Sequence, residues 1–338
     1  MKKILFNIVL TVLFALVMIL IIIKFEDPGM LQNTWALINY NYLVVACVFM
    51  VIYWLFDGVL LYNMVGIMSY KLSYRNSFNI TMSVQFFNAI TPFASGGQPA
   101  MVYLLSKKGI TYGESTALVV LKSIIFQASL FVVTIFSIIF NYRFFIRNIT
   151  GFIPLFLIGS LTNIGVILFY CMFFNKFLMS KIMNGLCNLI CKIGFKKQID
   201  KFRDNVNKEI EVMGTAMHTI RKNKRRITRF VFISVIKITV LCSILYFLQL
   251  ACEPVKASYI NMLTSQYMVT MITSLVPSPG AAGGAEGVGY VFFNVFFKTS
   301  SVLAVVFLWR LITYYSNLLI GGIFCLLNKD RPLKQEPS

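Results

Sequence analysis

The chain has 338 residues, of which 58% are hydrophobic and 13% are charged, and its formal net charge is +19. A mean hydropathy of +0.77 excludes an ordinary soluble domain and indicates a polytopic membrane protein. Most Lys and Arg residues flank apolar segments, so the charge fits the positive-inside rule and anionic lipid headgroups, and we expect no nucleic-acid partner.

The first half of the chain, residues 1–148, is predicted to contain three spans and one hairpin. The predicted spans are 4–23, 38–64 and 115–140. Lys2 and Lys3 place the start of the first span in the cytoplasm, and its long apolar run argues against a cleaved signal peptide. Both arms of segment 78–105 are too short to cross the membrane, and basic residues flank it. We therefore expect a re-entrant hairpin that enters from the cytoplasm.

The second half, residues 149–338, shows the same order of elements. The predicted spans are 152–174, 227–250 and 302–327. A second hairpin, 259–297, follows a span that ends outside, so it enters the membrane from the outer side. The two halves thus have opposite orientation, which is an inverted-topology repeat. We expect an all-α polytopic integral membrane protein with six full spans, two re-entrant broken-helix hairpins and both termini in the cytoplasm.

Between the fourth and fifth spans lies a long basic segment, 181–226. It contains twelve Lys or Arg residues against four Asp or Glu residues, and its apolar residues recur at helical spacing. This pattern predicts an amphipathic cytoplasmic helix that binds anionic inner-leaflet lipid. A linker helix that packs on the helix bundle is the alternative.

Two glycine-broken stretches look like copies of each other. The first runs from Pro92 to Pro99 and the second from Pro279 to Glu286; in both, Gly-Gly lies four and five residues after a proline. Proline and glycine interrupt helices, and a broken helix in lipid is tolerated only where it is buried in protein or lines a cavity. Paired breaks in corresponding places therefore predict the binding site of a transporter.

Five ionisable residues fall within the predicted membrane segments: Asp57, Lys122, Lys237, Glu286 and Arg310. Each costs about 2.5–3.5 kcal/mol at a helix centre, so such residues usually face a bundle interior or a pathway. The three cations would attract a phosphate, and the two carboxylates would balance them or meet an ammonium group. Internal ion pairs that only hold helices together are the alternative.

The breaks supply the remaining candidates for substrate binding and translocation: Ser95, Gly96, Gly97, Gln98, Gly283 and Gly284. Half-helices that start near Gly97 and Gly284 would aim their N-terminal amides at the same anion. The alternative is structural, with the glycines as close helix contacts and with Ser95 and Gln98 as helix caps.

The sequence predicts no metal site, no cofactor and no catalytic residue. The seven cysteines include no pair at CxxC spacing, and His218 is the single histidine. Neither glycine stretch continues as Gly-Lys-Ser/Thr, which a phosphate-binding loop requires. We therefore expect a transporter rather than an enzyme, with an enzyme acting on lipid headgroups as the alternative.

These motifs resemble the transmembrane region of lysylphosphatidylglycerol synthases, the multiple peptide resistance factor family. The resemblance rests on 88–99, 104–110, 277–287 and 309–315 and extends over essentially the whole chain. It implies a flippase that moves phosphatidylglycerol or its lysyl derivative between leaflets of the bacterial cytoplasmic membrane. Such transport lowers surface charge and gives resistance to cationic antimicrobial peptides. Full-length members also carry a soluble lysyl-transfer domain, which we do not expect here because the chain ends soon after the sixth span.

Two other functions stay open. One is a flippase for a polyprenyl-phosphate-linked sugar or a glycolipid, whose phosphate would suit the same cations. The other is the membrane part of a phosphatidylglycerol lysyltransferase system with a separately encoded synthase or glycosyltransferase as partner. A homodimer is a further prediction.

Overall fold

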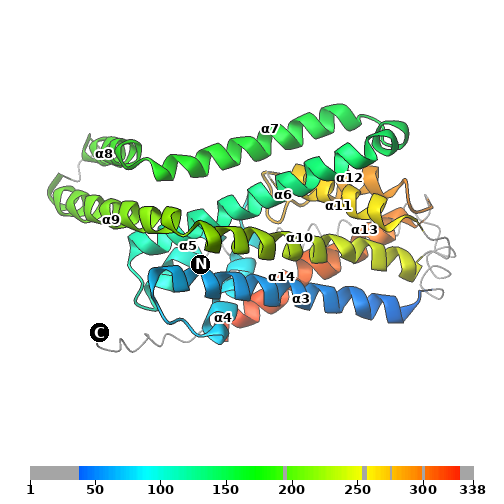
Figure 1. Ribbon diagram of the computed structural model, residues 1–338, viewed down its shortest axis with the longest axis horizontal. Helices are drawn as coiled ribbons and strands as arrows, with labels where there is room; N and C mark the ends of the chain where they lie inside the picture. The colour runs from blue at the N-terminus through cyan, green and yellow to red at the C-terminus, as the bar shows by residue number, and fades with distance from the viewer. Residues whose placement is uncertain (1–37, 193–195, 253–256, 275, 299–300, 328–338) are drawn as a thin grey trace.

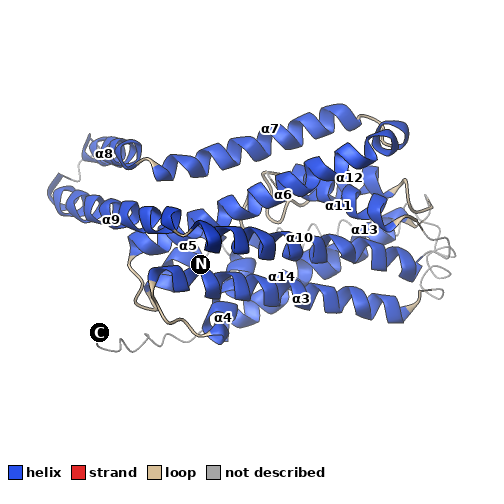
Figure 2. Cartoon of the chain, viewed as in Figure 1, coloured by secondary structure: helices blue, strands red, loops and turns tan. Residues whose placement is uncertain are grey.

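The computed structural model describes residues 38–192, 196–252, 257–274, 276–298 and 301–327 (Figure 1). The predicted first span, 4–23, lies outside these residues. Figure 2 shows helices and loops and no strand in the described part, which confirms the all-α prediction there.

Five helices of the described chain are long and apolar enough to cross a membrane. They are Tyr40–Met68 (α3, Tyr40–Val65, with η1, Gly66–Met68), Tyr112–Asn148 (α6), Phe152–Phe174 (α7, Phe152–Cys171, with η2, Met172–Phe174), Lys224–Cys252 (α10) and Val302–Leu327 (α13, Val302–Arg310, η3, Leu311–Tyr315, and α14, Ser316–Leu327). They coincide with the second to sixth predicted spans. The helix that corresponds to the third predicted span, α6, is longer than predicted, because it continues through a kink at Asn141.

The helices α3 and α10 form the centre of the bundle and run antiparallel, side by side (Figure 1). On α3 the buried residues Met50, Tyr53, Trp54 and Asp57 recur at helical spacing, so one face points into the protein. The opposite face carries exposed apolar residues, as expected for a helix in lipid.

Two pairs of short helices meet at the glycine breaks. They are α4 (Tyr74–Ala89) with α5 (Gly97–Ser106), and α11 (Tyr259–Thr273) with α12 (Gly284–Phe293). The second helix of each pair begins at the predicted glycine. An antiparallel bridge joins Pro92 to Pro279, so equivalent residues of the two motifs lie face to face.

The packing around the breaks is reciprocal. Helix α14 of the second half packs on α4, while α6 of the first half packs on α11. This exchange is what a two-fold axis between the halves would produce. The division of the chain at residue 148, the re-entry of the hairpins into the membrane and the side on which the termini lie stay predictions.

The basic segment forms two helices rather than one, α8 (Lys176–Lys192) and α9 (Lys196–Lys222). The apolar face of α9 is buried against the bundle through Ile210, Met213, Met217 and Ile220. A carboxylate oxygen of Glu209 also accepts a hydrogen bond of 2.6 Å from the backbone N–H of Gly113 on α6. This part of the segment therefore packs on the helix bundle, which was the alternative prediction. The binding of anionic lipid to the segment stays a prediction.

The contact between α6 and α9 depends on Gly113. A Cβ atom at this position would lie 2.4 Å from the backbone oxygen of Glu209. We expect Gly113→Ala to separate the helices and lower the stability by about 1–3 kcal/mol. Gly165→Ala is the control, because a Cβ there meets nothing within 4 Å. Thermal unfolding of the purified protein should show a lower Tm for Gly113→Ala alone; an equal Tm for both variants would contradict this contact.

Candidate functional site

A cavity of about 780 Å³ lies between the two glycine breaks. The first break contributes Phe93, Ser95 and Gln98 to its wall, and the second contributes Gly280 and Ala281. Side chains from α3, α6, α10 and α11 complete the lining. The two breaks, which are far apart in the sequence, thus open into one space.

Asp57 binds two lysines in the wall of this cavity. Its Oδ2 lies 3.0 Å from Nζ of Lys122, and its Oδ1 lies 2.7 Å from Nζ of Lys237. The Lys237 ammonium also lies 5.5 Å from the ring centroid of Tyr53 and 5.3 Å from that of Phe126. Such aromatic faces stabilise a cation that has lost most of its water.

Glu286 and Arg310 form the second charged pair. Nε of Arg310 lies 2.9 Å from Oε1 of Glu286, and a terminal guanidinium nitrogen donates to the carbonyl oxygen of Gly280 at 2.7 Å. The other carboxylate oxygen of Glu286 accepts a hydrogen bond of 2.7 Å from the backbone N–H of Gly283. The guanidinium stacks on Tyr314, 4.2 Å from the ring centroid. Glu286 thus caps α12 and links it to Arg310.

The charges of the two sets do not cancel. Three cations face two carboxylates, so one positive charge is left over. All three residues line the cavity, but the side chains of Asp57 and Lys237 are each only 4% exposed, whereas that of Lys122 is 13% exposed. Lys122 is therefore the member of the triad best placed to meet an anion that enters.

Glycine is required where the backbone meets side chains closely. A Cβ at Gly97 would lie 2.0 Å from Oδ1 of Asn88, and one at Gly280 would lie 1.9 Å from the ring of Tyr314. Gly280 also has φ +61, which disfavours other residues. The Tyr314 hydroxyl in turn donates to the carbonyl oxygen of Ala89 at 3.1 Å, so it connects the second half to the end of α4.

The structure places the predicted residues in two groups. Seven line the cavity: Asp57, Ser95, Gly97, Gln98, Lys122, Lys237 and Arg310. The other four do not belong to its lining: Gly96, Gly283, Gly284 and Glu286. The two half-helices also differ from each other. Gly97 of α5 faces the cavity, but the N-terminus of α12 is already capped by Glu286, so we do not assign both helix ends to one anion.

Four further residues of the site escaped the sequence analysis. Asn88 and Gln266 line the cavity, and the side-chain oxygens of both have no hydrogen-bond partner in the described chain. Gly280 and Tyr314 shape the second break. Gly280 lies inside the duplicated motif and could have been found there; Gln266 is one of many polar residues on α11, and the sequence does not distinguish it.

Among the described residues, no group of three or more His, Cys, Asp or Glu side chains is placed to hold a metal ion. The cavity lining carries two ammonium groups, a guanidinium, the Asp57 carboxylate and neutral polar side chains, and Glu286, outside the lining, pairs with the guanidinium. Such a set binds a charged headgroup through ion pairs and hydrogen bonds.

A family model described as the lysylphosphatidylglycerol synthase TM region matches residues 8–321. The chain belongs to this family. The match covers both glycine breaks and all five ionisable residues of the predicted membrane segments. Together with the five apolar helices, this membership shows a multi-pass membrane protein.

Two relatives of the chain are archaeal. A UPF0104 membrane protein of Archaeoglobus fulgidus is 27% identical over 327 residues, which are 92% of this chain and 94% of that protein. A UPF0104 membrane protein of Methanocaldococcus jannaschii is 26% identical over 275 residues, which are 78% of each chain. The placement in a bacterial cytoplasmic membrane stays a prediction.

Thermal unfolding of variants tests the charge balance at Asp57. Asp57→Asn leaves two buried ammonium groups without their carboxylate, so we expect a loss of about 3–5 kcal/mol. Adding Lys237→Met should restore part of this loss, because it removes one unpaired cation. Glu211→Gln is the control. It breaks the ion pair of Glu211 with Lys176, whose two partners are 67% and 58% exposed, and should change the stability little. Equal Tm values for Asp57→Asn and Glu211→Gln would contradict a tight triad.

Proposed function

We propose that the protein is a lipid translocator of the flippase type, which carries a phospholipid headgroup between leaflets through the cavity between the two breaks. The observation that supports this most is the surplus of formal positive charge around a cavity of about 780 Å³ at the meeting point of two broken helices. Paired breaks and buried charges of this kind mark substrate sites in transporters.

The residues suggest how a headgroup would be held. Its phosphate meets Lys122 and the N-terminal end of α5 at Gly97, where backbone N–H groups favour an anion. Asn88 and Gln266 also line the cavity, and their buried, unpartnered side-chain oxygens would accept hydrogen bonds from hydroxyl or ammonium groups of the same headgroup once a side-chain rotation exposes them. The acyl chains stay in the bilayer, because an apolar chain inside the cavity would leave its buried charges without polar partners.

The ion pair of Glu286 and Arg310 provides a way to couple binding to movement. Glu286 occupies the N-terminus of α12, the position that a phosphate would take at the equivalent end of α5. A phosphate that reaches Arg310 competes with this carboxylate. Release of Glu286 from Arg310 would remove the cap from α12 and loosen the second break. The site would then open to the other leaflet.

The cargo that the family description suggests is phosphatidylglycerol or its lysyl derivative. Its transport would change surface charge and resistance to cationic antimicrobial peptides. A polyprenyl-phosphate-linked sugar offers the same phosphate and is the second candidate. We propose transport as the role of this chain, and a separately encoded synthase or glycosyltransferase and a homodimer stay predicted partners.

The Lys122→Gln variant tests this function without unbalancing the fold, because Asp57 keeps Lys237 as a partner. We expect the rate of lipid exchange between leaflets of proteoliposomes to fall by about tenfold, since one ion pair of about 1.4 kcal/mol is lost. The assay compares labelled phosphatidylglycerol, lysyl-phosphatidylglycerol, a polyprenyl phosphate and phosphatidylcholine.

Lys222→Gln on the surface of α9 is the matched control, because it removes the same charge far from the cavity lining. It should exchange lipid as the unchanged protein does. Selective exchange of one of the first three lipids, lost only in Lys122→Gln, names the cargo. No exchange of any lipid by the folded protein, or equal rates for both variants, would contradict the proposal.

A further inference from the structure

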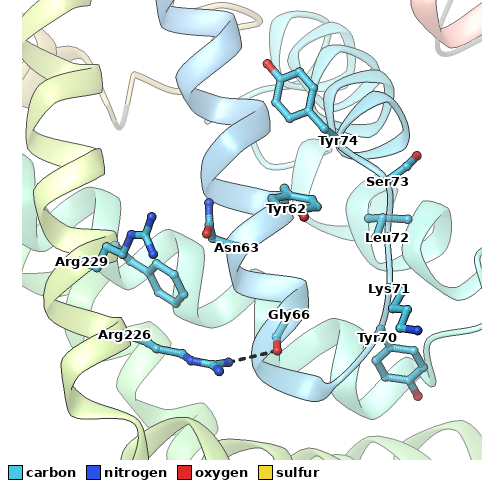
Figure 3. Close-up of a pocket in the computed structure, with 11 residues that line it drawn as sticks. Tyr62, Asn63, Gly66, Tyr70, Lys71, Leu72, Ser73, Tyr74, Arg226 and Arg229 are labelled. Atoms are coloured by element: carbon cyan, nitrogen blue, oxygen red, sulfur yellow. Dashed lines mark hydrogen bonds between the residues drawn. The ribbon is translucent and has the colours of Figure 1, made fainter. Parts of the chain in front are cut away.

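A second pocket, separate from the central cavity, surrounds the last turn of α3. Its volume is about 750 Å³. Figure 3 shows Arg226 and Arg229 reaching it from α10 on one side of α3, and Lys71 on the loop after α3 at the other side. Its lining shares no residue with the cavity between the breaks.

The pocket lies where the apolar part of two spans ends. The candidate span of α3 and η1 ends at Met68, and on α10 the first apolar residue is Ile227. Exposed apolar residues on α3, from Val44 to Leu55, lead along the helix to Tyr62 in the pocket wall. Tyrosine and arginine at the end of an apolar stripe mark the level of lipid headgroups.

The pocket is basic. Among the described residues, its lining contains Lys71, Arg226 and Arg229 and no Asp or Glu. Arg226 and Arg229 are three residues apart on α10, so they share a helix face. Arg226 donates one hydrogen bond of 3.1 Å to the carbonyl oxygen of Gly66 (Figure 3), which fixes its direction and leaves further N–H groups of the guanidinium for a ligand. Arg229 is exposed and makes no hydrogen bond or ion pair with any residue that the structure describes.

Tyr70, in the pocket lining, keeps its proton. The Tyr70 hydroxyl donates to Oε2 of Glu114 at 2.7 Å, and burial together with this carboxylate raises the pKa of Tyr70 to about 12. The nearby carboxylate is thus already bound by a phenol and a threonine hydroxyl. Among the described residues, the charged side chains of the lining itself are the two arginines and Lys71, and the Glu114 carboxylate lies beyond Tyr70.

We propose that this pocket is a binding site for the phosphate of an anionic membrane lipid, which is held by Arg226 and Arg229 at the membrane surface and is not transported. Two guanidinium groups on one helix face suit the oxygens of a phosphodiester. A basic pocket between spans at headgroup level is a common way to hold an anionic lipid. The site stands apart from the proposed translocation path, so it holds whether or not the protein moves lipid.

Binding of phosphatidylglycerol to the purified full-length protein tests this site, measured by native mass spectrometry with phosphatidylcholine of equal chain length as reference. The pocket variant is Arg226→Gln with Arg229→Gln. The matched control is Lys222→Gln with Arg225→Gln, which removes the same charge from neighbouring exposed positions outside the lining. All variants are also made in the Lys122→Gln background, which weakens the contribution of the central cavity.

We expect about tenfold weaker phosphatidylglycerol binding in the pocket variant, from the loss of two surface cations, and unchanged binding in the control. The single change Arg229→Gln, which breaks no contact in the described chain, should show part of the loss and guards against misfolding of the double variant. Millimolar inorganic phosphate in a further arm should not displace the lipid. Equal loss in pocket and control variants, equal binding of phosphatidylcholine, or full displacement by phosphate would overturn the proposal.

Discussion

A helix that breaks inside a membrane must satisfy its freed backbone groups within the protein, because lipid offers no hydrogen bonds. Here each break supplies its own partners. The Thr91 hydroxyl accepts from the N–H of Gly96, and Ser278 donates to the carbonyl oxygen of Ala282. Arg310 and Glu286 satisfy Gly280 and Gly283. This requirement explains why the two breaks lie together and why charged residues gather around them.

The same requirement separates structural charges from available ones. Glu286 and Arg310 neutralise each other and hold the second break, whereas Asp57 faces two lysines and cannot neutralise both. The triad therefore provides an electropositive wall, with Asp57 and Lys122 from the first half and Lys237 from the second, while Glu286 and Arg310 form a closed ion pair. A cavity with this asymmetry can receive an anion on one side and respond on the other, which is the physical basis of the proposed translocation.

Much of the fold could be predicted because hydropathy and glycine breaks are local signals. Five spans and the starts of α5 and α12 were found at the expected residues. The pairings could not be predicted: Asp57 is 65 residues from Lys122 and 180 from Lys237. The sequence also gave no means to distinguish Glu286 as a helix cap from Glu286 as a ligand, since both roles require a carboxylate at the same break. The docking of α9 on α6 requires a residue without a side chain at position 113. A single glycine in a helix leaves no pattern in the sequence from which this contact could be predicted.

The central claim is that a lipid headgroup enters the cavity between the breaks. Photo-crosslinking with a phosphatidylglycerol analogue that carries its photoreactive group on the headgroup, followed by mapping of labelled peptides, tests it most directly. The account predicts labels on the first break and on α6 near Lys122, and fewer of them when unlabelled phosphatidylglycerol competes. Labels confined to the surface helices α8, α9 and the start of α10 would contradict it.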